Sequence, residues 1–304
     1  MREDFLDTRH VAHFWNQTRR AADEEQQTGY LQDEWPAALA ANRLEGEWHD
    51  VRRWLDERGV TGGACLDVGC GVGVWLERLA RRFDHVHGID LSSEMVASAR
   101  ARVERLGLAN ATVAVQCVTD LPADARYDVV FVGGVLMYLD DRVVAETVAR
   151  LATMLRPGGL LILRESTSPA TWYRDQPLAP GLFAAPGAPR PPYYAIYRTP
   201  ESYRAMAEQH GLAVRRWQAN RHYKLADLTE TWLRFLDRVT FGRLARSRAG
   251  AERAARWVHR LRVVTLLPAY HLIRLVAPRT WRLNNYWYLC GPAPASAAPA
   301  ARSS

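Results

Sequence analysis

A glycine-rich segment at residues 66–73 carries the residue types and spacing that most clearly indicate chemistry. It reads Leu-Asp-Val-Gly-Cys-Gly-Val-Gly, follows a short apolar run and places three glycines at alternate positions. Glycines at the end of a buried strand let the backbone turn sharply and approach a ligand closely. The GxGxG spacing, with an acid before it in the strand, favours a nucleoside that carries an amino acid over the pyrophosphate of a dinucleotide.

A second acid, Asp90, ends the next apolar run, seventeen positions after Gly73. A carboxylate at this place can accept hydrogen bonds from both ribose hydroxyls, and it disfavours a 2′-phosphate. Ser92 already suits the N-cap of the helix that follows, so capping does not account for Asp90. The glycines and the two acids together predict a nucleoside site where two consecutive strands end.

The elements that position these residues alternate between short apolar runs and helical stretches. We predict strands at residues 65–68, 86–89, 111–118, 128–132 and 160–163, and helices at residues 74–82, 93–106 and 141–155. Strands and helices in alternation indicate a parallel sheet with helical crossovers. Asn110, Pro122 and the Arg-Pro-Gly-Gly segment at 156–159 provide the turns between them.

Helical and irregular segments flank this alternating region. Apolar residues near helical spacing predict a helix at 36–58, within an N-terminal helical cap that covers residues 1–60. The core then extends over residues 61–224 and includes a Pro-, Gly- and Tyr-rich connection at 166–199. This connection is too long for a plain loop, so we expect it to cover a site or to be poorly ordered.

The C-terminal third predicts a helix at 200–210 and strands at 212–218 and 284–290. If these two strands pair in the sheet, the segment between them is a helical insertion rich in arginine and tryptophan. The remaining predicted boundaries are 225–282 for the insertion, 283–291 for the final core strand and 292–304 for a disordered tail.

Four motifs in this order make the chain resemble the class I S-adenosylmethionine-dependent methyltransferases, specifically their small-molecule branch, over roughly residues 45–220. The motifs are residues 66–73, residues 87–95, Asp120-Leu121-Pro122 leading to 127–130, and the Leu-Arg-Pro-Gly-Gly-Leu segment at 155–160. The resemblance implies a doubly wound, Rossmann-like α/β fold with a mostly parallel sheet, and S-adenosylmethionine as the cofactor.

The resemblance also implies a role for individual residues. Asp67 would support the methionine amine, and Asp90 would hold the ribose. The further expected cofactor contacts are Gly69, Cys70 and Gly71 through their backbone, Leu91 and Met95 against the adenine, and Gly73, Cys117, Val118 and Gly133. Cys117 stands where the family often has an acid that accepts the adenine amino group. Either the backbone of Cys117 and Val118 suffices there, or Asp120 substitutes.

Methyl transfer from a sulfonium is an in-line displacement, so the protein chiefly aligns the acceptor with the methyl group and excludes water. A hydroxyl or protonated amine acceptor additionally requires a base, for which Tyr138, Glu165 and His222 are the candidates. A buried structural role is as natural for Tyr138, and Arg164 could simply pair with Glu165. The expected substrate residues are Arg164, Tyr193, Tyr194, Tyr197 and Arg198, of which the last four could instead pack the long connection onto the core.

Charge separates the insertion from the rest of the chain. The 304 residues have a formal net charge of +7, whereas residues 225–282 contain twelve arginines against four acids, a net charge of +8. Apolar bulk with tryptophan and arginine suits an anionic membrane surface, or a lid over an amphipathic or acidic acceptor. A helical subdomain with solvated arginines is the alternative.

Several classes of protein and site are disfavoured by what the sequence lacks. No run of eighteen apolar residues and no signal peptide is present, so we expect a cytoplasmic protein, peripheral to a membrane at most. Four cysteines without a CxxC pair, and no histidine cluster, argue against a disulfide framework and a metal site. An RNA methyltransferase would use the basic insertion, but no RNA-binding module is recognisable. A non-catalytic regulator that binds the adenosyl ligand is the third reading.

These observations predict a methyltransferase that acts on an oxygen or nitrogen of a small or lipid-like metabolite. Nucleic acid is not the expected partner.

Overall fold

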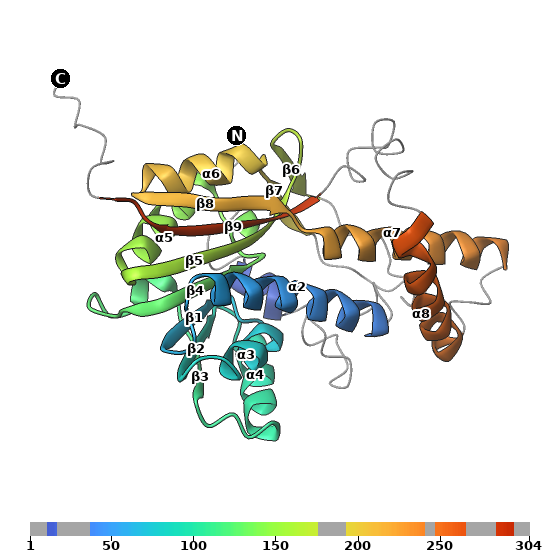
Figure 1. Ribbon diagram of the computed structural model, residues 1–304, viewed down its shortest axis with the longest axis horizontal. Coiled ribbons are helices and arrows are strands. Elements are labelled where there is room, and N and C mark those ends of the chain that lie inside the picture. The colour runs from blue at the N-terminus through green and yellow to red at the C-terminus, as the bar shows by residue number, and fades with distance from the viewer. Residues whose placement is uncertain (1–10, 17–36, 176–192, 241–246, 266–283, 295–304) are drawn as a thin grey trace.

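A seven-stranded sheet forms the centre of the computed structural model, which describes residues 11–16, 37–175, 193–240, 247–265 and 284–294 (Figure 1). The strand order is β3-β2-β1-β4-β5-β9-β8. The strands are β1 (Ala64–Val68), β2 (His85–Asp90), β3 (Ala111–Val115), β4 (Tyr127–Gly133), β5 (Leu155–Thr167), β8 (Leu212–Ala219) and β9 (Asn284–Pro292). Strands β1 to β5 are parallel, which confirms the predicted doubly wound, mostly parallel α/β fold.

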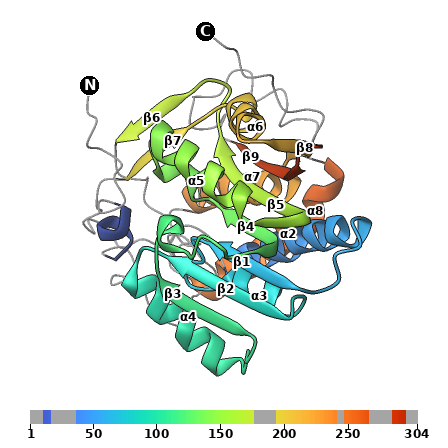
Figure 2. The same cartoon turned by 90° about the vertical axis from the view of Figure 1, so that its left-hand side faces the viewer.

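Helices cover both faces of the sheet (Figure 2). One face carries α2 (Ala37–Glu57), α3 (Val74–Ala80) and α4 (Ser93–Arg105), and the other carries α5 (Asp141–Thr153) and α6 (Pro200–Gln209). On the first face the rings of Trp75 and Phe131 lie 4.5 Å apart, and Trp54 contacts Trp287 edge to face. Large buried aromatic rings of this kind contribute much of the core's hydrophobic stabilisation.

The direction of β8 decides where the C-terminal helices lie. Strand β9 runs antiparallel to both β5 and β8, so β8 runs parallel to β5. The predicted pairing of the last two strands is therefore confirmed, and β1, β4, β5 and β8 all end at one edge of the sheet. Helices α7 (Arg221–Val239) and α8 (Arg248–Thr265) lie beyond this carboxyl edge, as Figure 1 shows.

Two predicted boundaries in the first half of the sheet were wrong. Strand β3 ends at Val115 rather than at 118, and a 3₁₀ turn, η2 (Val118–Asp120), follows it. The Asp120 carboxylate accepts the Cys117 backbone N–H at 3.3 Å, which closes the turn. Strand β5 begins at Leu155, so the Arg-Pro-Gly-Gly segment predicted as a turn lies within it, at an irregularity in the pairing with β4.

The region between β5 and β8 contains more regular structure than the sequence predicted. Strands β6 (Trp172–Asp175) and β7 (Tyr194–Tyr197) form an antiparallel pair within the long connection. Helix α7 begins at Arg221, because the Asn220 side chain accepts the backbone N–H groups of His222 and Tyr223 as its N-cap. Most of the cap ahead of α2, residues 176–192 of the connection, the end of the insertion and the tail from 295 lie outside the described residues.

Candidate active site

The glycine-rich turn between β1 and α3 lies at the carboxyl edge of the sheet. Gly69 has a φ of +67°, and a Cβ there would collide with the side chain of Val135, so the turn packs directly against the segment after β4. Gly71 has a φ of +54°, but no atom of the described residues lies within 4 Å of the Cβ that it lacks. Positive φ angles favour glycine at both positions, and Gly71 borders open space that a ligand can occupy.

Two carboxylates face this turn from neighbouring strands, and Asp67 is the more deeply buried of them. Asp67 is 1% exposed, and no described residue forms a hydrogen bond with its Oδ2. Asp90 accepts the Gly71 N–H at Oδ2 and the Ser92 N–H at Oδ1, both at 2.9 Å. Burial and the charge of Asp90 raise the pKa of Asp67 to about 8. Burial also raises the pKa of Asp90, against the lowering effect of its backbone hydrogen bonds.

These features fit the adenosyl cofactor implied by the four sequence motifs. A buried carboxylate oxygen without a donor is costly unless a ligand supplies one, and a methionine amine is such a donor. Asp90 retains acceptor capacity for ribose hydroxyls, since each carboxylate oxygen can accept more than one hydrogen bond. Asp67 could therefore hold the amino acid end of the cofactor and Asp90 its ribose, as the resemblance implies.

The remaining predicted cofactor residues lie around these two acids. Leu91 and Met95 stand at the start of α4, where the Met95 N–H donates to Ser92 Oγ at 3.1 Å. Cys117 and Val118 follow β3, and the Gln116 N–H donates to the Asp90 carbonyl at 3.0 Å, which joins this segment to β2. Gly73 precedes α3, Cys70 is buried in the turn, and Gly133 ends β4.

A short 3₁₀ helix, η3 (Leu136–Tyr138), lies beside the glycine-rich turn, because Val135 at its start contacts Gly69, and we call η3 the wall of the candidate site. The Glu165 carboxylate accepts three backbone N–H groups at its start, from Val135 and Leu136 at 3.0 Å and from Met137 at 3.3 Å. At its end, the Arg198 guanidinium donates to the carbonyl of Leu136 at 2.9 Å, to that of Leu139 at 2.7 Å and to Asp141 Oδ1 at 2.8 Å. We call these two side chains the η3 clamp.

The contacts of the η3 clamp indicate that Glu165 and Arg198 hold η3 in position. Burial raises the pKa of Glu165 to about 7, although its three backbone hydrogen bonds act in the opposite direction. Both carboxylate oxygens point at backbone N–H groups rather than into open space, which favours a positioning role over that of a base. Arg198 is 1% exposed and is likewise fully engaged with the backbone and Asp141.

Arg164 does not pair with Glu165, contrary to one sequence expectation. Neighbouring residues in a strand point to opposite faces of the sheet. Arg164 therefore turns toward α2, where it donates to Glu47 at 3.0 Å, and Asn220 donates to the same carboxylate oxygen at 2.8 Å. Burial acts to raise the pKa of Glu47, but the guanidinium groups of Arg164 and Arg43 outweigh it and hold the pKa below its usual value. This buried network ties α2, β5 and the start of α7 together.

An aromatic cluster extends from η3 toward the β6–β7 pair. Tyr138 and Tyr193 share a hydrogen bond between their hydroxyls at 3.1 Å, and Trp15 contacts the Tyr138 ring edge to face. Burial and the neighbouring Tyr138 raise the pKa of Tyr193 well above its ordinary value. Tyr197 belongs to the same cluster and stacks on Trp172, whereas Tyr194 is half-buried in β7.

The short helix at residues 11–16 connects this cluster to the cofactor side of the site (Figure 2). Asn16 Oδ1 accepts the Ser92 hydroxyl at 2.6 Å and the Glu94 N–H at 3.3 Å, immediately after Asp90. Phe14 and Trp15 meet Tyr193 and Tyr138. These residues were not predicted from the sequence, because six residues within a charged N-terminal stretch carry no periodic pattern.

His222, the third predicted base, lies apart from the groups around η3. Its Nε2 is 3.2 Å from Asp50 Oδ2, and a Cβ at Gly46 would collide with its ring. His222 therefore packs into the contact between α2 and α7. For Asp50, the hydrogen bond from His222 and the charge of Arg221 outweigh burial and lower its pKa.

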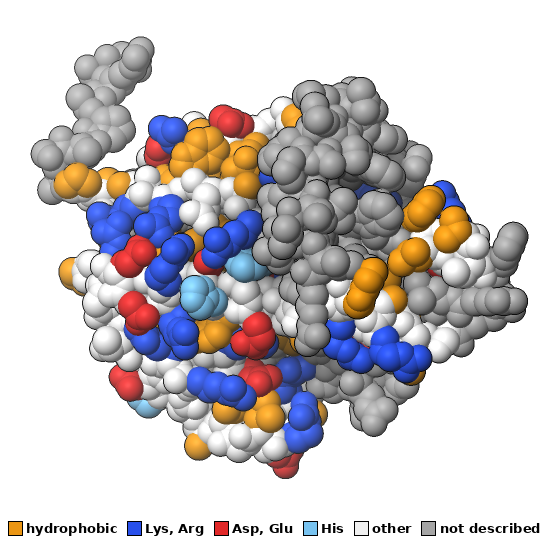
Figure 3. Space-filling model, turned by 45° about the vertical axis from the view of Figure 1, so that its right-hand side comes forward, with side chains coloured by type: hydrophobic (Ala, Val, Ile, Leu, Met, Phe, Trp, Pro, Cys, Tyr) orange, Lys and Arg blue, Asp and Glu red, His pale blue; other side chains and the backbone are white. Residues whose placement is uncertain are grey.

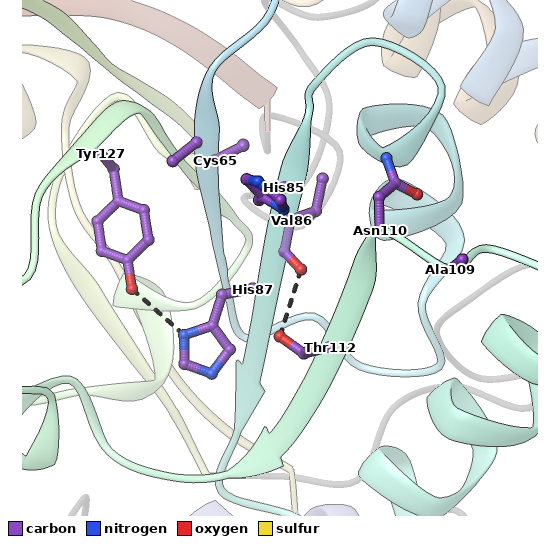
Figure 4. Close-up of a pocket in the computed structure, with 9 residues that line it drawn as sticks. Cys65, His85, Val86, His87, Ala109, Asn110, Thr112 and Tyr127 are labelled. Carbon is purple, nitrogen blue, oxygen red and sulfur yellow. Dashed lines mark hydrogen bonds between the residues drawn. The ribbon is translucent and has the colours of Figure 1, made fainter.

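A cavity of about 140 Å³ opens at the opposite edge of the sheet, where β1 and β2 begin (Figure 4). His85 and His87 line it, and His87 Nδ1 lies 3.2 Å from the Tyr127 hydroxyl. Within the described ranges no three His, Cys, Asp or Glu side chains are placed to hold a metal ion. Because it lies at the amino ends of these strands, this cavity is separate from the glycine-rich turn.

Comparisons with known proteins agree with this geometry. The family model of the methyltransferase domain matches residues 65–159. The ubiquinone biosynthesis O-methyltransferase of Aeromonas salmonicida is 30% identical over 132 residues, which cover 40% of this chain and 54% of the relative. The enzyme of the same name from Acinetobacter baumannii is 34% identical over 110 residues, 35% of this chain and 46% of the relative. The chain thus spans about half the length of these curated relatives.

Solved structures show the same fold. Magnesium protoporphyrin IX methyltransferase from Synechocystis PCC 6803 with bound SAM has a TM-score of 0.52 at 21% identity, covering 72% of this chain and 93% of that one. Phosphoethanolamine N-methyltransferase 2 of Haemonchus contortus, in complex with S-adenosyl-L-methionine, has a TM-score of 0.51 at 21% identity, covering 81% and 53%. The family-model match identifies residues 65–159 as a methyltransferase domain, in agreement with the sequence motifs, and the solved structures show the same fold.

Proposed function

We propose that this protein transfers a methyl group from S-adenosylmethionine to an oxygen or nitrogen of a small or lipid-like acceptor. One observation supports this proposal above the others: the buried Asp67 oxygen and the open space at Gly71 lie beside a wall that the η3 clamp holds in place. The contact between Gly69 and Val135 brings the two halves of the site together. Oxygen is favoured as the acceptor atom by the names of the curated relatives.

The residues of the chain chiefly align and enclose the reactants. Bound S-adenosylmethionine supplies an electrophilic methyl group on a sulfonium. Asp67 would hold the amino acid end of this ligand and Asp90 its ribose, and η3 would form the wall beside which the acceptor is aligned with the methyl group. The ligand would supply the methyl group to the acceptor's lone pair, and its sulfur would keep the electrons of the broken carbon–sulfur bond.

Of the three side chains considered as a base, Tyr138 alone stands where it could contact an acceptor. The Tyr138 hydroxyl lies in the wall and bonds the Tyr193 hydroxyl, whereas the Glu165 carboxylate is engaged by backbone and His222 lies between α2 and α7. We propose that Tyr138 orients an acceptor hydroxyl, whose proton leaves to water. An acceptor that is already ionised has no proton to lose. The aromatic rings around Tyr138 suit an acceptor with a planar, apolar body.

An acceptor screen with isotopically labelled S-adenosylmethionine tests the proposed activity. The panel would contain phenols, catechols and amines, each with and without an alkyl or isoprenoid chain, and products would be detected by mass spectrometry. We expect methylation of a phenolic or catecholic oxygen, reduced in Asp90→Ala at subsaturating cofactor and reduced in Tyr138→Phe. Binding of the cofactor without labelled product from any member of the panel would contradict the proposed acceptor class.

A further inference from the structure

Three large apolar side chains on α7 and α8 are more than half exposed. Phe235 is 54%, Val239 is 52% and Trp257 is 65% exposed. Where the two helices pack together, by contrast, Leu233 and Ala251 are fully buried. The helices thus bury one side against each other and leave large apolar groups in water on another, an arrangement that commonly marks an interaction site.

Arginines accompany these apolar residues. Arg238, Arg253 and Arg256 are exposed, and Arg253 lies one helical turn before Trp257. Figure 3 shows orange apolar side chains over this part of the molecule with blue basic side chains beside them. Glu252, an acid between these arginines, is directed inward, where it accepts the Ala38 N–H at 3.0 Å. We call Phe235, Arg238, Val239, Arg253, Arg256 and Trp257 the insertion face.

The insertion face belongs to the end of the molecule that carries the candidate active site. Helix α7 starts directly after β8, at the edge where β1 and β4 also end (Figure 1). A surface that binds the insertion face therefore lies near the side from which an acceptor approaches Tyr138. Within the described residues no helix has both the length and the apolar character required to cross a membrane, so any membrane contact by them is peripheral.

We propose that the insertion face docks on the surface of an anionic lipid membrane. Tryptophan and phenylalanine side chains partition into the region between headgroups and acyl chains, and arginines pair with lipid phosphates. A nucleic acid would satisfy the arginines but leave Val239 and Phe235 in water. The net charge of +8 over residues 225–282 complements an anionic surface. Docking itself does not depend on the proposed reaction. Its use, which is to bring the candidate active site to a lipid-like acceptor, rests on the proposed function.

Vesicle co-sedimentation of the full chain tests this proposal. The probes are phosphatidylcholine vesicles with and without phosphatidylglycerol, and a single-stranded RNA oligonucleotide. We expect binding to the anionic vesicles, little binding to neutral ones, and weakening as salt is added. Neutralising Arg253 and Arg256 together (R253Q/R256Q) should lower the partition constant by about tenfold or more, since each basic residue adds to the attraction. Trp257→Ser should also weaken binding, because it removes an interfacial anchor.

Matched controls separate docking from general effects on charge and exposure. R52Q/R58Q replaces one exposed arginine of α2 and one in the turn just after it, which removes the same charge elsewhere. Tyr173→Ser removes an aromatic residue that is 66% exposed on β6. Both controls should retain vesicle binding. Equal loss in the controls, binding to RNA but not to vesicles, or no vesicle binding at all would overturn the proposal. Calorimetry of each variant with S-adenosylmethionine reports on the proposed function separately, so either can fail alone.

Discussion

Asp67 combines complete burial with a carboxylate oxygen that no described residue satisfies. With a pKa of about 8, it is largely protonated at neutral pH before the cofactor binds. A cationic amine favours the charged carboxylate, so cofactor binding should release a proton from Asp67. The affinity for S-adenosylmethionine should therefore rise as the pH increases toward 8.

Calorimetry in buffers of different ionisation enthalpy tests this proton release. At pH 7, Asp67→Asn should bind the cofactor more weakly and abolish the released proton, whereas Asp124→Asn, at an exposed position, should change neither. Proton release that persists in Asp67→Asn would assign it to another group.

The same residue should oppose folding stability. Its pKa in the folded protein lies above the ordinary value of 3.8, so its stabilising contribution is present below pH 3.8 and is lost as the pH rises toward 8. We expect Asp67→Asn to raise Tm, by an amount that grows between these two pH values and then levels off. A Tm difference independent of pH would contradict this assignment.

At the scale of secondary-structure elements, the η3 clamp joins residues that lie far apart in the chain: Glu165 at the end of β5 and Arg198 after β7 both bind η3. Glu165→Gln replaces one acceptor oxygen by an NH₂ group that faces backbone donors, so the wall should lose its fixed position. At saturating cofactor we expect kcat to fall by about tenfold or more, as for the loss of a hydrogen bond to a charged group, with little change in cofactor affinity. Glu146→Gln on the exposed side of α5 is the matched control.

A pH profile distinguishes this positioning role from general loss of structure. Because Glu165 has a pKa of about 7, protonation below that pH removes acceptor capacity and should lower kcat on the acidic side. The Glu165→Gln variant should lack this acidic limb. An unchanged acidic limb in the variant would mean that Glu165 does not control the position of η3 during turnover.

The buried Glu47 network gives a prediction for stability. Glu47 neutralises Arg43 and Arg164, both of which are buried. Glu47→Gln should therefore lower the free energy of unfolding by about 3–5 kcal/mol, the usual cost of leaving a buried charge unpaired. Glu45→Gln, two residues away on α2 and 67% exposed, should change it by less than about 1 kcal/mol. Equal effects in the two variants, measured by denaturant unfolding, would contradict this account of the network.

The sequence predicted those elements whose signals are local. Alternating apolar runs located six core strands to within a few residues, and Ser92 marked the start of α4. Asn220 is the same kind of signal for α7, but the insertion was predicted to begin only at 225. The η3 clamp and the Glu47 network were not predictable, since each joins residues that lie far apart in the chain. Arg43, Glu47 and Asp50 do give a signal in retrospect, because they interrupt an apolar face of α2 at helical spacing.

At the scale of the whole molecule, the residues of the candidate site lie at one edge of the sheet. The glycine-rich turn, the η3 wall, residues 11–16 and the start of α7 all meet the carboxyl ends of the strands, the usual binding edge of open α/β sheets. Of the predicted site residues, Asp67, Gly71 and Asp90 lie at this edge, and their roles stay predictions. The alternative that Arg164 pairs with Glu165 is not what the structure shows, because Arg164 donates to Glu47 on α2.

Calorimetric titration of the purified full chain with S-adenosylmethionine, S-adenosylhomocysteine and NAD tests the central claim most directly. We predict binding of the two adenosyl ligands and not of NAD. In Asp90→Ala, loss of charge-assisted hydrogen bonds should weaken this binding by roughly 1.5–3 kcal/mol, with the fold intact by circular dichroism. Binding of NAD alone, or an unchanged affinity for the adenosyl ligands in the folded Asp90→Ala variant, would contradict the account.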